Sequence, residues 1–163
     1  MSTPRVTARV TEGEIARTLN MLIEINTDAT KGYATAAADA RSPVLKGILS
    51  DRGKQAGERV MALQNAIARM GRFAENQGTL RGTLHRGWLD ARMVLEGRTD
   101  RIMLEECERG EAVALRAYEA IPTQVLEALS PDVVGMVDEQ HFEYRDAHED
   151  TARRLKELAD AAA

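Results

Sequence analysis

The sequence is poor in aromatic residues and has a single cysteine. Of its 163 residues, two are Phe, three are Tyr and one is Trp. This scarcity argues against a protein built from sheets, in which aromatic and β-branched residues are enriched. One cysteine excludes an intramolecular disulfide and fits a reducing compartment. No apolar run approaches the roughly 18 residues that a membrane-spanning helix needs.

The chain also lacks a basic stripe. It has 22 Lys and Arg against 26 Asp and Glu, which gives a formal net charge of −4. A nucleic-acid-binding protein needs a clustered positive surface, so that class is excluded. The opening MSTPRVTARV has no apolar core of a secretory signal. We therefore expect a cytoplasmic protein that binds neither nucleic acid nor membrane, with a flexible N-terminus at 1–10 and one domain at 11–160.

Helix-start and helix-stop signals divide the rest of the chain. They predict long helices over about 11–40, 42–70, 100–121 and 130–160, and a shorter helix over 79–96. The signals themselves are Thr11 with Glu14, Ser42-Pro43, Gly71, Thr99 or Asp100, and Ser130-Pro131. Pro122 is expected to interrupt or kink the third long helix. No segment alternates with period two over a useful length, so no strand is expected.

The connection lengths predict how these helices are joined. About two residues separate the first pair, which should form an antiparallel hairpin. About 28 residues separate the second and third long helices, enough to cross the full length of a bundle. We therefore predict an all-α, ferritin-like four-helix bundle whose long crossover carries the short extra helix.

Several polar residues fall on the apolar stripes when each is placed at 100° per residue. The stripe of the first helix includes Asn26 and Tyr33, and that of the second includes Arg52 and Arg59, whereas Glu58 points outward. The last helix contributes a longer polar set on its inner side, which comprises Gln140, His141, Tyr144, His148 and Thr151.

The third long helix contains LEECERGE at 104–111, with four glutamates around the only cysteine. Relative to a buried side that includes Cys107 and Tyr118, Glu111 lies inside the stripe and Glu108 at its border. Glu105 lies further round, and Glu106 is expected to face solvent. The run therefore divides into inward and outward carboxylates.

Two interpretations of the inward groups stay open. Glu108 and Glu111, with His141 and His148 on the last helix, have the ligand types of an iron or zinc site. Arg52 and Arg59 would instead repel a metal cation and pair with those carboxylates. We favour the second, an interior polar network without a catalytic residue or cofactor, whose further members are Tyr33, Tyr118, Gln140 and Tyr144.

Two other residues have simpler roles in this scheme. Cys107 is expected to be a small core residue rather than a nucleophile. Trp88, in the string HRGW at 85–88, either anchors the short helix to the bundle or forms a partner-binding patch. We favour the anchor.

Several strings together resemble an uncharacterised family of bacterial ferritin-like proteins, over residues 14–160. They are LNMLIEINTDATKGYATAAAD at 19–39, LHRGWLDAR at 84–92, LEECERGE, and the later Tyr118, Gln140 and His148. The family is similar in fold to rubrerythrins and ferritins. The resemblance implies a four-helix bundle with one long crossover, and the wider superfamily implies a di-iron site of two glutamates and two Glu-x-x-His pairs.

The sequence departs from that di-iron pattern. The first helix has no inward carboxylate, the second has Glu58-x-x-Met61, and the last has Arg145-x-x-His148. We therefore expect a non-enzymatic bundle that acts through its surface or as a homo-oligomer, most simply a dimer. The alternatives are a degenerate iron or zinc protein linked to oxidative or metal stress, and a helix-binding adaptor that uses the surface near Trp88.

Overall fold

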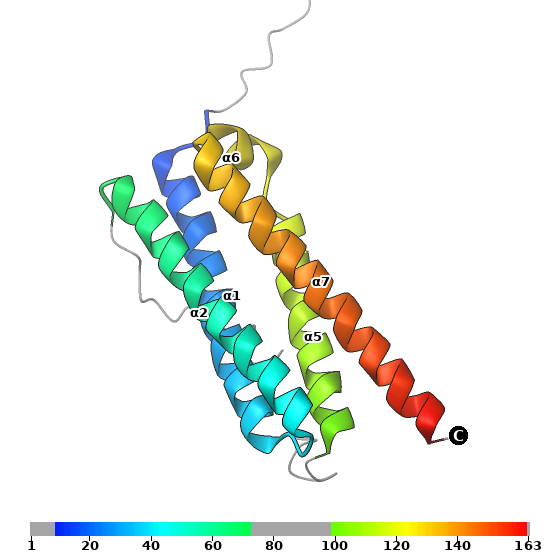
Figure 1. Cartoon of the computed structure of the whole chain (residues 1–163). Helices are drawn as coiled ribbons and strands as arrows, with labels where there is room; N and C mark the ends of the chain where they lie inside the picture. Colours follow the sequence, from blue (N-terminus) through cyan, green and yellow to red (C-terminus); the bar gives the residue numbers. More distant parts are fainter. Residues whose placement is uncertain (1–8, 73–98, 163) are drawn as a thin grey trace, which may run out of the picture.

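The computed structural model describes residues 9–72 and 99–162, and all regular structure in these ranges is α-helical. The helices are α1 (Glu12–Asp39), α2 (Pro43–Arg69), α5 (Asp100–Glu119), α6 (Thr123–Ala128) and α7 (Pro131–Ala161) (Figure 1). The all-α class is therefore confirmed for the described residues. The short helix predicted over 79–96, Trp88 within it, and the flexible N-terminus up to residue 8 lie outside them.

Three of the predicted helix starts are confirmed by side-chain caps. The side chain of Thr11 accepts a hydrogen bond from the Glu14 amide at 3.2 Å, and the Glu14 carboxylate accepts one from the Thr11 amide at 2.7 Å. This reciprocal arrangement satisfies two amides that a helix start leaves without intrahelical partners. Ser42 caps α2, with Pro43 at its first position, and Thr99 caps α5. After Pro122 the chain forms the six-residue α6, which the apolar spacing did not predict.

Gly71 ends α2 with φ +71°, in the left-handed region that side chains disfavour. Gly71→Ala is expected to lower the free energy of unfolding by about 1 kcal/mol, because a Cβ clashes there with its own backbone. Gly57→Ala, inside α2, is the matched control and should raise it by up to about 1 kcal/mol. An added Cβ meets nothing within 4 Å at either position, so only the backbone conformation differs. Urea unfolding measures both changes. If the two substitutions changed the free energy of unfolding in the same direction, this explanation would be contradicted.

Contacts at the helix ends fix the topology. The carboxylate of Asp100 accepts hydrogen bonds from the amides of Arg41 and Ser42, at 2.6 and 3.0 Å. The start of α5 therefore lies beside the α1–α2 turn, and α2 and α5 run in the same direction (Figure 1). The end of α2 and the start of α5 therefore lie at opposite ends of these helices. Helix α7 runs antiparallel to α5.

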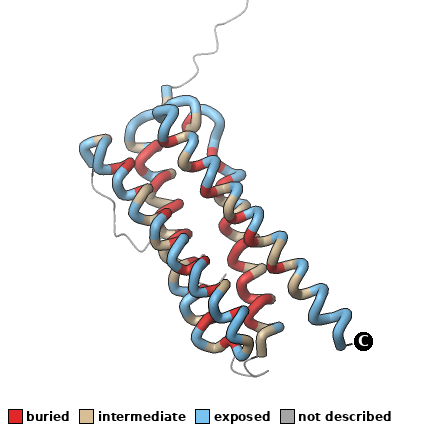
Figure 2. Tube along the Cα trace, in the orientation of Figure 1, coloured by how far each residue is buried: buried red, intermediate tan, exposed pale blue. Residues whose placement is uncertain are grey.

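The core lies between the four long helices, where the buried positions face one another (Figure 2). Helix α1 packs against α2 and α5, and α5 packs against α7, whereas α2 and α7 pack against each other less extensively than these three pairs do. The fully buried apolar side chains come from α1, α2 and α5, and they include Leu19, Leu22, Leu49, Leu63, Ile67 and Met103.

Two large apolar side chains on these helices are exposed. Leu158 is 40% exposed, because it lies in the last turns of α7, which are mostly exposed to solvent. Met61 is 57% exposed on the outer face of α2. Within the described ranges, no helix has both the length and the apolar character required to cross a bilayer.

Candidate functional site

The first of two polar clusters in the interior centres on Asn26 of α1. Its Nδ2 donates hydrogen bonds to the Tyr118 hydroxyl and to the Leu22 carbonyl, both at 2.8 Å. Tyr144 donates to Asn26 Oδ1 at 2.9 Å, and Tyr118 donates to Gln140 Oε1 at 2.7 Å. We call Asn26, Tyr118, Gln140 and Tyr144 the asparagine cluster. It joins α1, α5 and α7 with each amide group held in one orientation.

Burial keeps the phenols of this cluster protonated. It raises the pKa of Tyr118 to about 12, and it raises the pKa of Tyr144 further. The guanidinium carbon of Arg59 lies 4.5 Å from the centre of the Tyr144 ring, and Arg59 Nε donates to Glu143 at 2.7 Å. The cluster thus borders one charged pair without containing a charge of its own.

The second cluster centres on Glu111 of α5, which is fully buried. Its Oε1 accepts hydrogen bonds from the Tyr33 hydroxyl at 2.7 Å, from Arg52 Nη1 at 3.0 Å and from Thr151 Oγ1 at 3.2 Å. We call Tyr33, Arg52, Glu111 and Thr151 the glutamate cluster. All four long helices contribute one residue, so the cluster ties the bundle together at this level.

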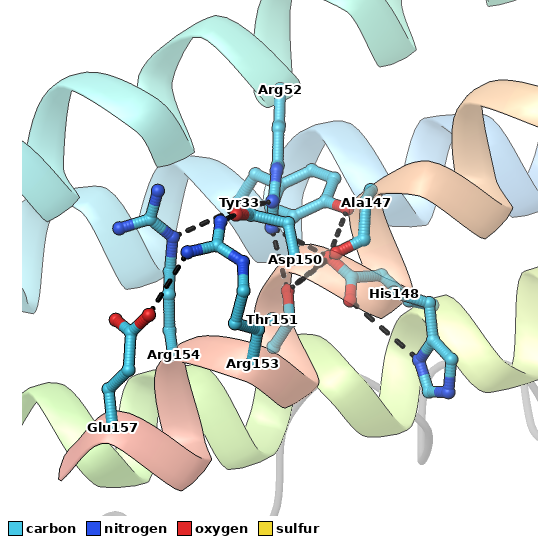
Figure 3. Close-up of polar contacts among 10 residues, drawn as sticks. Tyr33, Arg52, Ala147, His148, Asp150, Thr151, Arg153, Arg154 and Glu157 are labelled. Carbon is cyan, nitrogen blue, oxygen red and sulfur yellow. Dashed lines mark hydrogen bonds and ion pairs between the residues drawn. The ribbon is translucent and has the colours of Figure 1, made fainter.

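Arg52 extends the glutamate cluster toward the surface of α7 (Figure 3). Its Nη1 donates to Thr151 Oγ1 at 2.7 Å and its Nη2 to the Asp150 carboxylate at 2.6 Å. Asp150 is also bound by Arg153 and by Arg154. The side chain of Arg52 is about nine-tenths buried, and its guanidinium connects two carboxylates.

The electrostatic balance at Glu111 is set first by its burial. Burial raises the pKa of Glu111, and the charge of Arg52 and the hydrogen bonds from Tyr33 and Thr151 oppose this effect. Burial and the neighbouring carboxylate also raise the pKa of Tyr33 well above its ordinary value. Tyr33 therefore stays a hydrogen-bond donor, and the site holds one carboxyl group beside one permanent cation.

The second oxygen of Glu111 has a different environment. Oε2 lies 3.9 Å from His148 Nδ1, and neither atom has a hydrogen-bond partner among the described residues. The imidazole is partly exposed, whereas the carboxylate is fully buried. Within the described residues, the hydrogen bonding of this pair is therefore incomplete.

Of the four residues predicted as metal ligands, the structure brings Glu111 and His148 together but does not gather all four at one point. His141 lies 3.7 Å from Glu119, His148 lies beside Glu111, and Glu108 is half-buried on α5. In residues 9–72 and 99–162, no group of three or more His, Cys, Asp or Glu residues could hold one ion. Seven residues of helix place His141 and His148 roughly 10 Å apart along α7, which explains their separation.

The structure brings together the residues predicted to form an interior network, with some different partners. Arg52 pairs with Glu111 as predicted. Arg59 pairs with Glu143 instead of Glu108 or Glu111. Asp150 also pairs with Arg52, and this pairing was not predicted. Its position directly before Thr151, a residue predicted to face inward, was the available signal.

Glu106 corrects the division of LEECERGE. It was expected to face solvent but is 4% exposed, and its carboxylate accepts two hydrogen bonds from Arg109, both at 2.9 Å. The buried surface of α5 includes Met103 and Gly110 beside Glu106, so it is wider than one stripe. Cys107 is fully buried as predicted, and burial raises the pKa of its thiol, which disfavours the reactive thiolate.

Comparison with known proteins identifies a family for this arrangement. No curated protein matches the chain. Residues 14–124 match the family described as Domain of unknown function (DUF2383). The matched segment contains Tyr33, Arg52 and Glu111, while α7 with Thr151 follows it. Since the match covers more than half of the sequence, the chain belongs to this family, Domain of unknown function (DUF2383).

Proposed function

We propose that this protein is a ferritin-like bundle without enzymatic activity, which acts through its outer surface and uses protein side chains in place of an interior metal. Its connectivity supports the ferritin-like assignment, because two antiparallel helix pairs are joined by one long connection. The observation that carries the proposal is the guanidinium of Arg52, held inside the bundle against Glu111.

The interior residues do not fit a di-iron centre. Such a centre takes carboxylates from all four helices and a histidine from each of two. On α1 the inward polar residues are Asn26 and Tyr33, and on α2 they are Arg52 and Arg59. Helix α5 supplies Glu111, whose Oε1 already accepts three hydrogen bonds. Among the described residues, the carboxylate of Glu111 beside Arg52 and Arg59 is the wrong donor set for two iron ions.

Charge repulsion adds to this mismatch. An arginine stays protonated in proteins, so Arg52 is a fixed positive charge 3.0 Å from the Glu111 carboxylate. Two unit charges 4 Å apart interact by about 4 kcal/mol at an effective dielectric constant of 20, and a divalent ion would double that repulsion. The guanidinium therefore neutralises Glu111 and disfavours a metal cation at the same carboxylate.

Metal content tests the proposal. Protein purified without chelators and then dialysed against iron or zinc should retain less than about 0.1 ion per chain, because Arg52 occupies the carboxylate. Elemental analysis by mass spectrometry gives this ratio. A retained ion at about one per chain would contradict a metal-free interior.

A degenerate single-ion site is the second candidate, and one observation favours it. Glu111 Oε2 and His148 Nδ1 lie 3.9 Å apart and both lack a hydrogen-bond partner among the described residues. If an ion were retained there, His148→Ala should remove it while His141→Ala, the matched control on the same helix, should not. Equal metal content in both variants would exclude this site.

A further inference from the structure

The sulfur atoms of the described residues differ widely in their exposure to solvent. Met61, on α2, is 57% exposed, whereas Met103, on α5, is fully buried. Cys107, the only cysteine of the chain, lies one helical turn after Met103 and is also fully buried. Three further methionines pack against the core from partly buried positions; these are Met21, Met70 and Met136. Among the described residues, the thioether of Met61 is therefore the sulfur most open to solvent.

The helix geometry of α2 explains why Met61 is open. It lies two positions from Arg59 and two from Leu63, both of which are buried. Positions two apart on a helix point to nearly opposite sides, so Met61 points outward. Its side chain leans over the preceding turn, which contains Gly57. A Cβ built on Gly57 would meet nothing within 4 Å, so a small oxidant can reach the sulfur without any opening of the bundle.

The fold protects the group that peroxides usually attack, a cysteine thiolate. Cys107 is fully buried between the helices. Burial raises the pKa of its thiol, and the negative charge of Glu111 acts in the same direction. Met103, in the preceding turn, is equally buried. Both sulfur atoms of α5 therefore react only when this helix separates from the bundle.

We propose that Met61 is a modification site of the folded protein, at which a hydroperoxide oxidises the thioether to the sulfoxide. The sulfur bonds to the terminal oxygen of the hydroperoxide while the O–O bond breaks, and the proton of that oxygen moves to the departing oxygen. The sulfur loses two electrons, and the hydroperoxide is reduced to an alcohol or, from hydrogen peroxide, to water.

The consequence is a local change of the α2 surface from apolar to polar. The sulfoxide at Met61 removes no contact of the core, so the bundle stays folded. Met61 belongs to neither the asparagine cluster nor the glutamate cluster. This inference therefore goes beyond the proposed function, and either can fail without the other.

Peptide mapping by mass spectrometry, after brief treatment of the full chain with hydrogen peroxide, tests this site. Trypsin releases residues 60–69, whose only sulfur is that of Met61, and residues 102–109, which contain Met103 and Cys107. Peptide 60–69 should gain one oxygen atom at least about ten times faster than peptide 102–109, because buried sulfur atoms react only during local opening. In the urea-unfolded control, the two methionines should react at similar rates.

A pair of glycine variants tests the role of the open turn. Gly57→Leu places a side chain beside the thioether and should slow the oxidation of Met61 by about threefold. Gly47→Leu is the matched control, because a Cβ there also meets nothing within 4 Å. It lies roughly 21 Å from Met61 along the axis of α2 and should leave the rate unchanged. Circular dichroism verifies the helix content of both variants.

Three results would overturn the proposal. Equal oxidation of the two peptides in the folded protein would show that burial does not protect the sulfur atoms of α5. Equal rates in the two glycine variants would show that the open turn does not control access to Met61. Loss of helix content in protein oxidised at Met61 alone would show that the folded bundle does not tolerate the sulfoxide.

Discussion

Arg52→Met is expected to lower the free energy of unfolding by about 3 to 5 kcal/mol, the usual effect of removing one partner of a buried ion pair. The substitution keeps much of the side-chain volume but leaves Glu111 buried beside Tyr33 and Thr151 without a cation. For a domain of this size, the melting temperature should fall by about 10 °C. Urea unfolding at neutral pH measures the free energy, and calorimetry measures the melting temperature.

Arg153→Met is the matched control, because Arg153 also binds Asp150 but its side chain is 58% exposed. It should cost less than about 0.5 kcal/mol, as is usual for exposed ion pairs. Adding Glu111→Gln to Arg52→Met should recover part of the loss, because the uncompensated charge is then removed. If Arg52→Met unfolds like the wild type, Glu111 is not held by this pair, and the proposed reason for a metal-free interior fails with it.

The helix boundaries were predictable because their signals are local. A capping threonine with glutamate three residues later, a serine before proline, and a glycine that can adopt positive φ each act within one turn of the chain. The starts at Thr11, Ser42 and Ser130 and the stop at Gly71 depend on no distant residue. The parallel direction of α2 and α5 followed from the length of the connection alone.

Which polar residues face inward was also largely predictable, because helical periodicity fixes direction. Asn26, Arg52, Arg59 and Glu111 are all buried as their stripes predicted. Glu106 was not predictable in this way. The periodicity of α5 indicates one buried stripe, whereas α5 packs against both α1 and α7 and buries a wider surface.

The pairing of these residues could not be read from the sequence, because it depends on the relative heights of the helices. A shift of one helical turn, about 5.4 Å along the axis, would exchange the partners of an arginine. Arg59 therefore meets Glu143 on α7, and Arg52, two turns earlier in α2, meets Glu111. The same dependence on height applies to the four predicted metal ligands, of which Glu111 and His148 lie together while His141 lies beside Glu119.

Glu111→Ala is expected to lower the free energy of unfolding by about 3 kcal/mol, because it leaves a cavity and removes the acceptor for Tyr33, Arg52 and Thr151. Glu111→Gln keeps the shape and one acceptor oxygen, and it should stay within about 1 kcal/mol of the wild type at neutral pH. Urea unfolding of the two variants separates the role of the hydrogen bonds from that of the charge. A glutamine variant as unstable as the alanine variant would show that the negative charge itself is required.

The pH dependence of the free energy of unfolding, compared between the wild type and Glu111→Gln, gives the sign of the charge effect. Burial raises the pKa of Glu111 in the folded protein above its ordinary value of 4.5. The folded state therefore holds this proton more tightly than the unfolded state, and the resulting stability is fully present below pH 4.5 and is lost as the pH rises through the folded pKa. Glutamine does not titrate, so the stability of the wild type relative to Glu111→Gln should fall between about pH 4.5 and neutral pH. The opposite slope would mean that Arg52 and the hydrogen bonds outweigh burial, and that the interior favours the ionised carboxylate.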